Sequence, residues 1–298
     1  MSAPQPRYVS HYLKCAGREI HCLEWGAGQD QTVVAWHGLA RTARDMDELA
    51  ERLSGQGFRV LCPDLIGRGL SQWSPQPAQE YCLDFYARIA EDFFVAMNIR
   101  KAHWVGTSMG GALGMVCASG LSQPALKSKI LSLTLNDTAP QVAASAIARI
   151  RSYAGSPPAF QTMNELEKFF RQVYLPYGFL TDSQWRRLTE SSTRRLPDGR
   201  VTPHYDPAMV QQFVHYPDDY LIWQHYDEIE VPTLCLRGEH SDLVERETVS
   251  RMRLRGPGAS GRLTVEEIPD CGHAPALNVA SQLDLVARFI EEANQLAA

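Results

Sequence analysis

Residues 102–120 read AHWVGTSMGGALGMVCASG, and this stretch decides the fold. Its first four residues form a short apolar run typical of a buried strand, and residues 108–120 are small and apolar, as in a buried helix. Ser108 lies at the turn between the two. Gly106 and Gly110 carry no Cβ atoms that would collide where a helix begins directly after a strand. The stretch therefore predicts a strand, a sharp turn and a helix, with an exposed serine hydroxyl at the turn.

A serine hydroxyl is a weak nucleophile unless a base takes its proton and a carboxylate orients that base. His273 follows an expected strand at 263–268 and is the candidate base. Asp242 follows an expected strand at 233–236 and is the candidate acid. The order serine, aspartate, histidine along the chain is the one expected when the nucleophile lies on such a turn of a parallel sheet. We therefore predict a triad of Ser108, Asp242 and His273.

Two other carboxylates are alternatives to Asp242. Asp137 ends an expected strand at 130–135 and is the alternative acid, although it is also suited to a turn in which it bonds local amides. Glu239 is a third candidate. We favour Asp242 because a loop after the penultimate strand fits the expected chain order.

Acyl transfer also needs N–H donors for the negative charge that develops on the substrate oxygen. The expected strand 32–36 runs into His37-Gly38-Leu39, and the backbone N–H of Leu39 is the natural partner of the Met109 N–H. These two amides are the predicted oxyanion hole. We expect His37 to shape this loop through backbone hydrogen bonds, because it leads the loop instead of facing the serine.

The rest of the chain predicts an α/β fold with a mostly parallel sheet of roughly eight strands flanked by helices. Further strands are expected at 8–13, 19–25 and 59–62, and the intervening helical patterns lie at 42–53 and 83–97. We assign residues 1–138 and 230–298 to this core domain. Residues 139–229 read as helices and loops without strand alternation and are rich in aromatic residues, which predicts an inserted helical lid (cap) over an apolar pocket.

Composition excludes several classes of function. The 298 residues are 44% hydrophobic with a net charge of −5 and no basic block, so nucleic acid is not an expected partner. The segment Met1–Lys14 has no apolar core of a signal peptide, and no apolar run is long enough to span a membrane, so we predict a cytoplasmic protein. The seven cysteines form no C-x-x-C pair, and neither a metal motif nor a nucleotide-binding motif occurs, so no metal or cofactor is predicted.

Together these motifs resemble those of the α/β-hydrolase fold serine hydrolases. The resemblance extends over nearly the whole chain, through the segments HG (37–38), DLIGRGLS (64–71), GTSMGG (106–111), RGEHSD (237–242) and CGHAP (271–275). It implies a catalytic triad on a nucleophile elbow and a lid after the sixth strand. One departure concerns the acid, which many members place three residues after the glycine of the acid loop. Ser241 stands there in this chain, and Asp242 follows it.

The resemblance implies a carboxylic ester hydrolase that forms an acyl-enzyme and acts on a small molecule with an apolar portion. Lactone, thioester and C–C bond hydrolysis use similar residues, and the last usually needs a basic side chain for a substrate carboxylate, which Arg41 or Arg44 could supply. A small-molecule sensor with slow turnover is the rival from another class. The complete catalytic set favours the enzyme, since a receptor does not require it. The sequence leaves the oligomeric state open.

Overall fold

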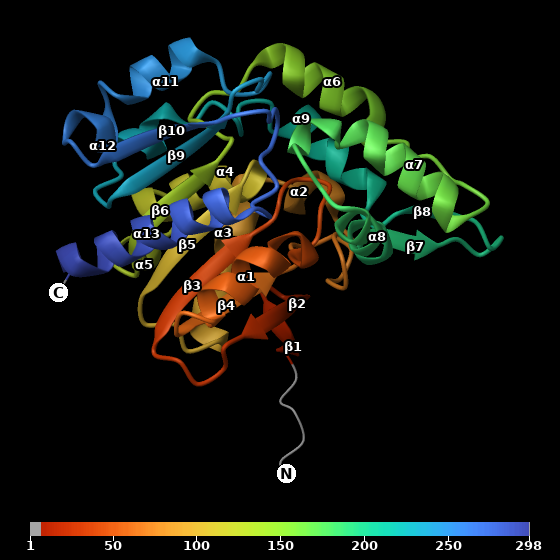
Figure 1. The fold of residues 1–298 in the computed structure, drawn as a ribbon, viewed down its shortest axis with the longest axis horizontal. Coiled ribbons are helices and arrows are strands. Elements are labelled where there is room, and N and C mark those ends of the chain that lie inside the picture. The colour runs from red at the N-terminus through yellow and green to blue at the C-terminus, as the bar shows by residue number, and fades with distance from the viewer. Residues whose placement is uncertain (1–6, 298) are drawn as a thin grey trace.

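A twisted sheet of eight strands forms the centre of the computed structural model, which describes residues 7–297 (Figure 1). The strand order is β1-β2-β4-β3-β5-β6-β9-β10, and all neighbouring pairs are parallel except β1–β2 and β2–β4. The strands are β1 (Tyr8–Cys15), β2 (Arg18–Trp25), β3 (Gln31–Trp36), β4 (Phe58–Pro63), β5 (Ala102–Thr107), β6 (Ile130–Asn136), β9 (Thr233–Gly238) and β10 (Leu263–Ile268). This confirms the predicted fold class, because helices flank the sheet on both faces.

The helices of the core domain connect these strands. They are η1 (Ala43–Met46), α1 (Asp47–Ser54), α2 (Pro77–Glu80), α3 (Leu83–Ala96), α4 (Met109–Ser119), α5 (Pro124–Lys127), α11 (Arg246–Met252), α12 (Gly256–Ala259) and α13 (Ala280–Ala297). Every residue of α4 is buried, as expected for a helix that is apolar on all sides. The helix that begins at the predicted turn is therefore held rigidly at the centre of the molecule.

Side-chain alternation along the central strands builds a separate core on each face of the sheet. On β3, Val33 and Ala35 contact a cluster that includes residues of α1 and α13, whereas Val34 and Trp36 contact a cluster that includes residues of α3 and α4. Trp36 stacks on Trp104 of β5, with ring centroids 5.3 Å apart. Because successive residues of a strand point to opposite faces, one apolar run stabilises both layers.

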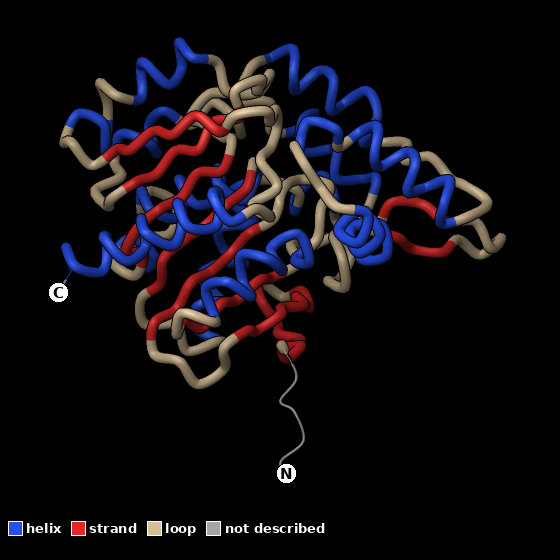
Figure 2. The backbone as a smooth tube through the Cα atoms, in the orientation of Figure 1, coloured by secondary structure: helices blue, strands red, loops and turns tan. Residues whose placement is uncertain are grey.

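An insertion of 96 residues, 137–232, separates β6 from β9 and lies at one side of the sheet (Figure 2). Its elements are α6 (Ala144–Ala154), α7 (Met163–Val173), η2 (Leu175–Tyr177), α8 (Asp182–Ser191), β7 (Thr193–Arg195), β8 (Val201–Pro203), η3 (Pro207–Gln211), α9 (Gln212–His215) and α10 (Trp223–Asp227). It contains a small core of its own, made of Leu166, Phe170, Trp185, Leu188 and Val201. This local core allows α7 and α8 to keep a defined shape beyond the edge of the sheet.

The prediction that the insertion contains no strands is wrong. The strands β7 and β8 pair antiparallel around a turn in which the Leu196 N–H donates to the Arg200 carbonyl over 2.8 Å. Each strand has three residues, which is too short for alternation of apolar and polar residues to be recognised. Gly199, with φ of +87°, completes the turn.

Two earlier expectations concern the chain as a whole. Among residues 7–297, no helix is both long and apolar enough to cross a bilayer. Residues 1–6, which belong to the segment predicted to lack a signal peptide, lie outside the described residues. The division into residues 1–138 with 230–298 and residues 139–229 stays a prediction.

Candidate active site

Ser108 lies in the strained turn that the sequence predicts. The residue stands between the end of β5 and the start of α4, with φ of +53° and ψ of −117°. Such a positive φ is rare for a residue with a side chain and is found where the surroundings impose it. Here the Ser108 N–H donates to the Asn136 carbonyl over 2.9 Å, and the Ser108 carbonyl accepts from Gly111 and Ala112 over 2.9 and 3.0 Å. The turn is therefore fixed from both sides.

The glycines of the turn allow close contact between backbones. A Cβ atom on Gly106 would overlap the backbone of Gly110, and a Cβ atom on Gly110 would overlap the carbonyl of Trp36. Neither neighbour can move aside, because both are backbone groups in the central strands or in α4. The packing thus agrees with the reason for which Gly106 and Gly110 were selected from the sequence.

His273 is oriented by Asp137. The imidazole Nδ1 lies 2.7 Å from Oδ2 of Asp137, and the carboxylate is completely buried. Asp137 is the first residue after β6, where its N–H donates to the Leu236 carbonyl over 2.8 Å. The imidazole is mostly buried, with 17% of its side chain exposed. Since the carboxylate occupies Nδ1, Nε2 is the ring nitrogen left for a substrate or a nucleophile.

The loop after β9 completes the surroundings of the Asp137 carboxylate. Its Oδ1 accepts from the Gly238 N–H over 2.8 Å, and its Oδ2 accepts from the Ser241 hydroxyl over 2.7 Å. The Ser241 oxygen accepts in turn from the Val244 N–H over 3.1 Å. Ser241 holds the position at which many α/β-hydrolases carry the acid. In this protein its hydroxyl instead donates to Asp137, the carboxylate that follows the neighbouring strand β6.

The predicted pairing of Asp242 with His273 requires correction. Oδ2 of Asp242 accepts from the Arg149 guanidinium over 2.6 Å, and both side chains are about half exposed. Glu239, the third candidate, accepts from the Asp270 N–H over 3.2 Å. The alternative acid therefore occupies the place assigned to Asp242, because β6 lies between β5 and β9 in the sheet and its end adjoins the histidine loop. Sequence order alone could not separate these two strand ends.

The loop after β3 is held by a neutral histidine. His37 is fully buried, its Nδ1 lies 2.7 Å from the Gly38 carbonyl, and its Nε2 lies 3.0 Å from the Leu65 nitrogen. Because the Leu65 N–H donates to Nε2, the proton of the neutral ring belongs on Nδ1, from which it donates to Gly38. Burial lowers the pKa of His37, which also favours the neutral ring. His37 therefore shapes the loop, as expected from the sequence.

Arg68, from the segment DLIGRGLS, supports the same loop, a contact that the sequence did not predict. The guanidinium is completely buried, and its Nε donates to the Leu39 carbonyl over 2.8 Å. Another of its nitrogens lies 3.7 Å from the sulfur of Met109. Arg68 thus touches both residues whose amides were predicted to form the oxyanion hole. Within residues 7–297, neither the Leu39 N–H nor the Met109 N–H donates to another protein group.

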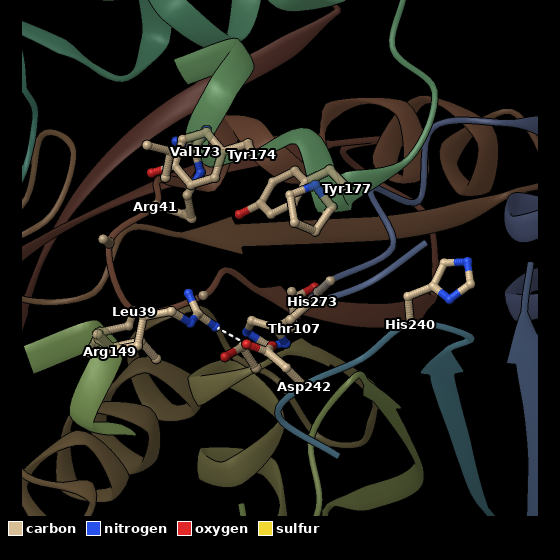
Figure 3. Close-up of a pocket in the computed structure, with 16 residues that line it drawn as sticks. Leu39, Arg41, Thr107, Arg149, Val173, Tyr174, Tyr177, His240, Asp242 and His273 are labelled. Carbon is tan, nitrogen blue, oxygen red and sulfur yellow. Dashed lines mark hydrogen bonds and ion pairs between the residues drawn. The ribbon is translucent and has the colours of Figure 1, made fainter. Parts of the chain in front are cut away.

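A cavity of about 420 Å³ lies over these groups (Figure 3). The core domain contributes Leu39, Ser108, His273 and Asp242 to its lining, so the cavity brings together four of the residues selected from the sequence. The insertion contributes Tyr174 and Tyr177, together with further residues that sequence reasoning did not single out for the site, namely Arg149, Ile150, Val173 and Pro176. The tyrosines belong to the aromatic enrichment of the insertion, whereas nothing in the sequence marks Arg149.

The segment after α7 attaches the insertion to both sides of the cavity. On the histidine loop, Gly272 donates to the Pro176 carbonyl over 2.7 Å, and Ala276 donates to the Tyr177 carbonyl over 3.2 Å. On the other side, the Tyr174 ring covers the guanidinium of Arg41 at 4.5 Å. Such a contact is an attractive cation–π interaction. The part of the cavity wall formed by the segment after α7 is therefore connected to both loops that carry candidate catalytic groups.

Neither the cysteines nor the other histidines form a metal centre in the described part of the chain. All seven cysteines are buried and free, and no three side chains of the His, Cys, Asp or Glu types between residues 7 and 297 lie together as metal ligands.

The chain belongs to the alpha/beta hydrolase family, whose model matches residues 33–289. It is 36% identical over 276 residues to a 3-hydroxybutyrate-oligomer hydrolase of Cupriavidus necator, which covers 89% of this chain and 90% of that protein. The protein is a hydrolase of this family.

Solved structures show the same fold. An alpha/beta hydrolase from Novosphingobium aromaticivorans is 29% identical, with a TM-score of 0.83 over 96% of this chain and 99% of that one. E-2-(acetamidomethylene)succinate hydrolase, at 21% identity, has a TM-score of 0.80 and covers 95% of this chain and 99% of that one. At that identity the second likeness concerns the fold alone.

Proposed function

We propose that the protein is a serine esterase that hydrolyses short oligoesters of 3-hydroxybutyrate, with Ser108, His273 and Asp137 as the catalytic triad. The observation that carries the proposal is the 2.7 Å contact between His273 Nδ1 and the buried Asp137, beside a cavity that Ser108 also lines. The substrate class is supported by the name of the relative from Cupriavidus necator, which aligns over most of both chains. No cofactor enters the proposed reaction.

The mechanism follows from the orientation of the imidazole. His273 Nε2 takes the proton of Ser108 as the serine oxygen bonds to the ester carbonyl carbon, and Asp137 stabilises the imidazolium that forms. The carbonyl oxygen gains a negative charge, which the N–H groups of Leu39 and Met109 stabilise. The ester C–O bond then breaks, and the alcohol leaves with the proton from His273.

Water completes the second half of the reaction. His273 takes a proton from water as its oxygen attacks the acyl carbon of the acyl-enzyme. The bond to Ser108 breaks, the serine oxygen recovers the proton, and the carboxylic acid leaves. In the same proposal, residues 139–229 act as a lid whose aromatic side chains accommodate the apolar methyl groups of the substrate.

The test measures hydrolysis of p-nitrophenyl butyrate and of the linear 3-hydroxybutyrate dimer by the wild type, Ser108→Ala and Ser183→Ala. Ser183 is an exposed serine of α8 and serves as the matched control. We expect Ser108→Ala to lose at least ~10³-fold in kcat, in the range found when a triad residue is removed, while Ser183→Ala retains activity. Turnover that survives Ser108→Ala would reject the serine mechanism. Cleavage of p-nitrophenyl butyrate without cleavage of the dimer would reject the proposed substrate.

A further inference from the structure

Two arginines line the cavity, and they differ in how their charge is neutralised. Arg41 is 3% exposed, and two of its nitrogens donate to Asp45 over 2.7 and 2.6 Å. Tyr174 covers the same guanidinium. Its remaining nitrogen, Nη1, is buried and has no hydrogen-bond partner among the described residues. The Arg41 charge is thus already neutralised by Asp45 within the wall of the cavity.

Arg149 on α6 is arranged differently. The Arg149 side chain is 49% exposed. Among the described residues, its guanidinium makes a single polar contact, a hydrogen bond to Asp242 over 2.6 Å. Figure 3 shows this pair joining the insertion to the loop after β9, and Thr107 and His273 line the same cavity. Exposed ion pairs contribute about 0–1 kcal/mol to stability, so the cost of separating this pair is small.

We propose that Arg149 binds the free carboxylate of the substrate and that Asp242 holds the guanidinium in place until the substrate arrives. This inference rests on the proposed function, because it assigns a part of the oligoester to a side chain. The site thus selects esters that carry a carboxylate on the alcohol side of the scissile bond.

The chemistry of the oligoester fits this arrangement. In the linear dimer, the alcohol that leaves is itself a 3-hydroxybutyrate, so its carboxylate is separated from the ester oxygen by two carbon atoms. Arg149 and Ser108 line one cavity of about 420 Å³, which a molecule of this size can span. The guanidinium offers several donors to a carboxylate in a planar fork, and Asp242 occupies one of its nitrogens. In the proposal, the carboxylate of the substrate replaces that of Asp242.

The roles of the two side chains make opposite predictions for their variants. Loss of Arg149 removes the donor, so it weakens binding of the carboxylate. Loss of the Asp242 charge removes a competitor for the guanidinium and a repulsive charge, so it strengthens binding. A purely structural latch between α6 and the loop after β9 would instead be weakened by either change.

The experiment measures dissociation constants by calorimetry in the Ser108→Ala background, so that binding is tested without turnover. The ligands are the linear 3-hydroxybutyrate dimer and its terminal carboxamide, which has nearly the same shape and no charge. Arg149→Gln, Asp242→Asn and the control Arg151→Gln are each combined with Ser108→Ala. Arg151 lies on the same helix, is exposed and does not line the cavity.

We expect the acid to bind about ten- to hundredfold more tightly than the carboxamide, as for a hydrogen bond to a charged group. Arg149→Gln should abolish this preference, so that the acid and the carboxamide bind equally. Asp242→Asn should increase the preference, and Arg151→Gln should leave it unchanged. Equal binding of the two ligands by the parent Ser108→Ala protein overturns the inference. So does weaker binding of both ligands in Arg149→Gln and in Asp242→Asn alike. The esterase assay is separate, so a protein that binds the acid selectively but fails to cleave it rejects only the proposed function.

Discussion

Exchange of the proposed triad acid, Asp137, for its amide distinguishes the two candidate carboxylates. In Asp137→Asn, the amide oxygen can still accept from the Gly238 N–H, but the NH₂ group then faces His273 Nδ1. The imidazole must accept that hydrogen bond at Nδ1, which places its own proton on Nε2. Nε2 is the nitrogen that has to take the proton of Ser108, so the variant holds the base in the inactive tautomer.

The size of the effect follows from this change of tautomer. The same exchange in a Ser-His-Asp triad lowers kcat by about 10⁴, which corresponds to roughly 5 kcal/mol in the activation barrier. We expect a loss of ~10³- to 10⁴-fold for Asp137→Asn. Its free energy of unfolding should fall by about 1–3 kcal/mol, because the Gly238 N–H keeps a weaker acceptor whereas the Ser241 hydroxyl loses the acceptor it has at Oδ2. Asp242→Asn should change kcat by less than about tenfold, since its carboxylate is half exposed and contacts Arg149.

The assay is steady-state hydrolysis of p-nitrophenyl butyrate, with urea denaturation of each variant to show that it is folded. Asp30→Asn, an exposed position before β3, provides the matched control for loss of a negative charge. A folded Asp137→Asn protein with at least a tenth of the wild-type kcat would refute the assignment. So would a loss of ~10³-fold in Asp242→Asn.

Three further predictions concern the turn, the oxyanion loop and pH. Gly110→Ala places a Cβ atom against the Trp36 carbonyl. It should therefore lower the free energy of unfolding by about 1–3 kcal/mol and reduce kcat. Wild-type values in denaturation and esterase assays would contradict the packing argument. Arg68→Lys removes the Nε donor to the Leu39 carbonyl, so we expect a kcat about tenfold lower with KM nearly unchanged. A change in KM alone would contradict a role of Arg68 in the oxyanion loop. Burial raises the pKa of Asp219 to about 6, so the folded protein holds this proton more tightly than the unfolded chain and stability falls as pH rises from about 4 to about 6. Relative to the wild type, the free energy of unfolding of Asp219→Asn in urea denaturation should therefore be higher at pH 7.5 than at pH 4 by about 2 kcal/mol. An equal difference from the wild type at both pH values would contradict this linkage.

The local parts of the site were predictable because each depends on a few consecutive residues. The turn at Ser108 needs only a short apolar strand, two glycines and a helix of small residues, all of which lie within nineteen positions of the printed sequence. The strands were predictable for the same reason, since each is a run of β-forming residues between turn signals. The two three-residue strands of the insertion were not, because their pairing depends on one turn and not on a pattern.

The sequence by itself determined the sheet, the order of its elements and the positions of the serine and the histidine. Only the tertiary structure decided which carboxylate meets the imidazole and which arginines line the cavity. Asp137 and Asp242 both follow parallel strands, and those strands, β6 and β9, are neighbours in the sheet. The choice between them depends on backbone geometry and burial at one edge of the sheet, where side chains more than one hundred positions apart in the chain come within 3 Å of each other.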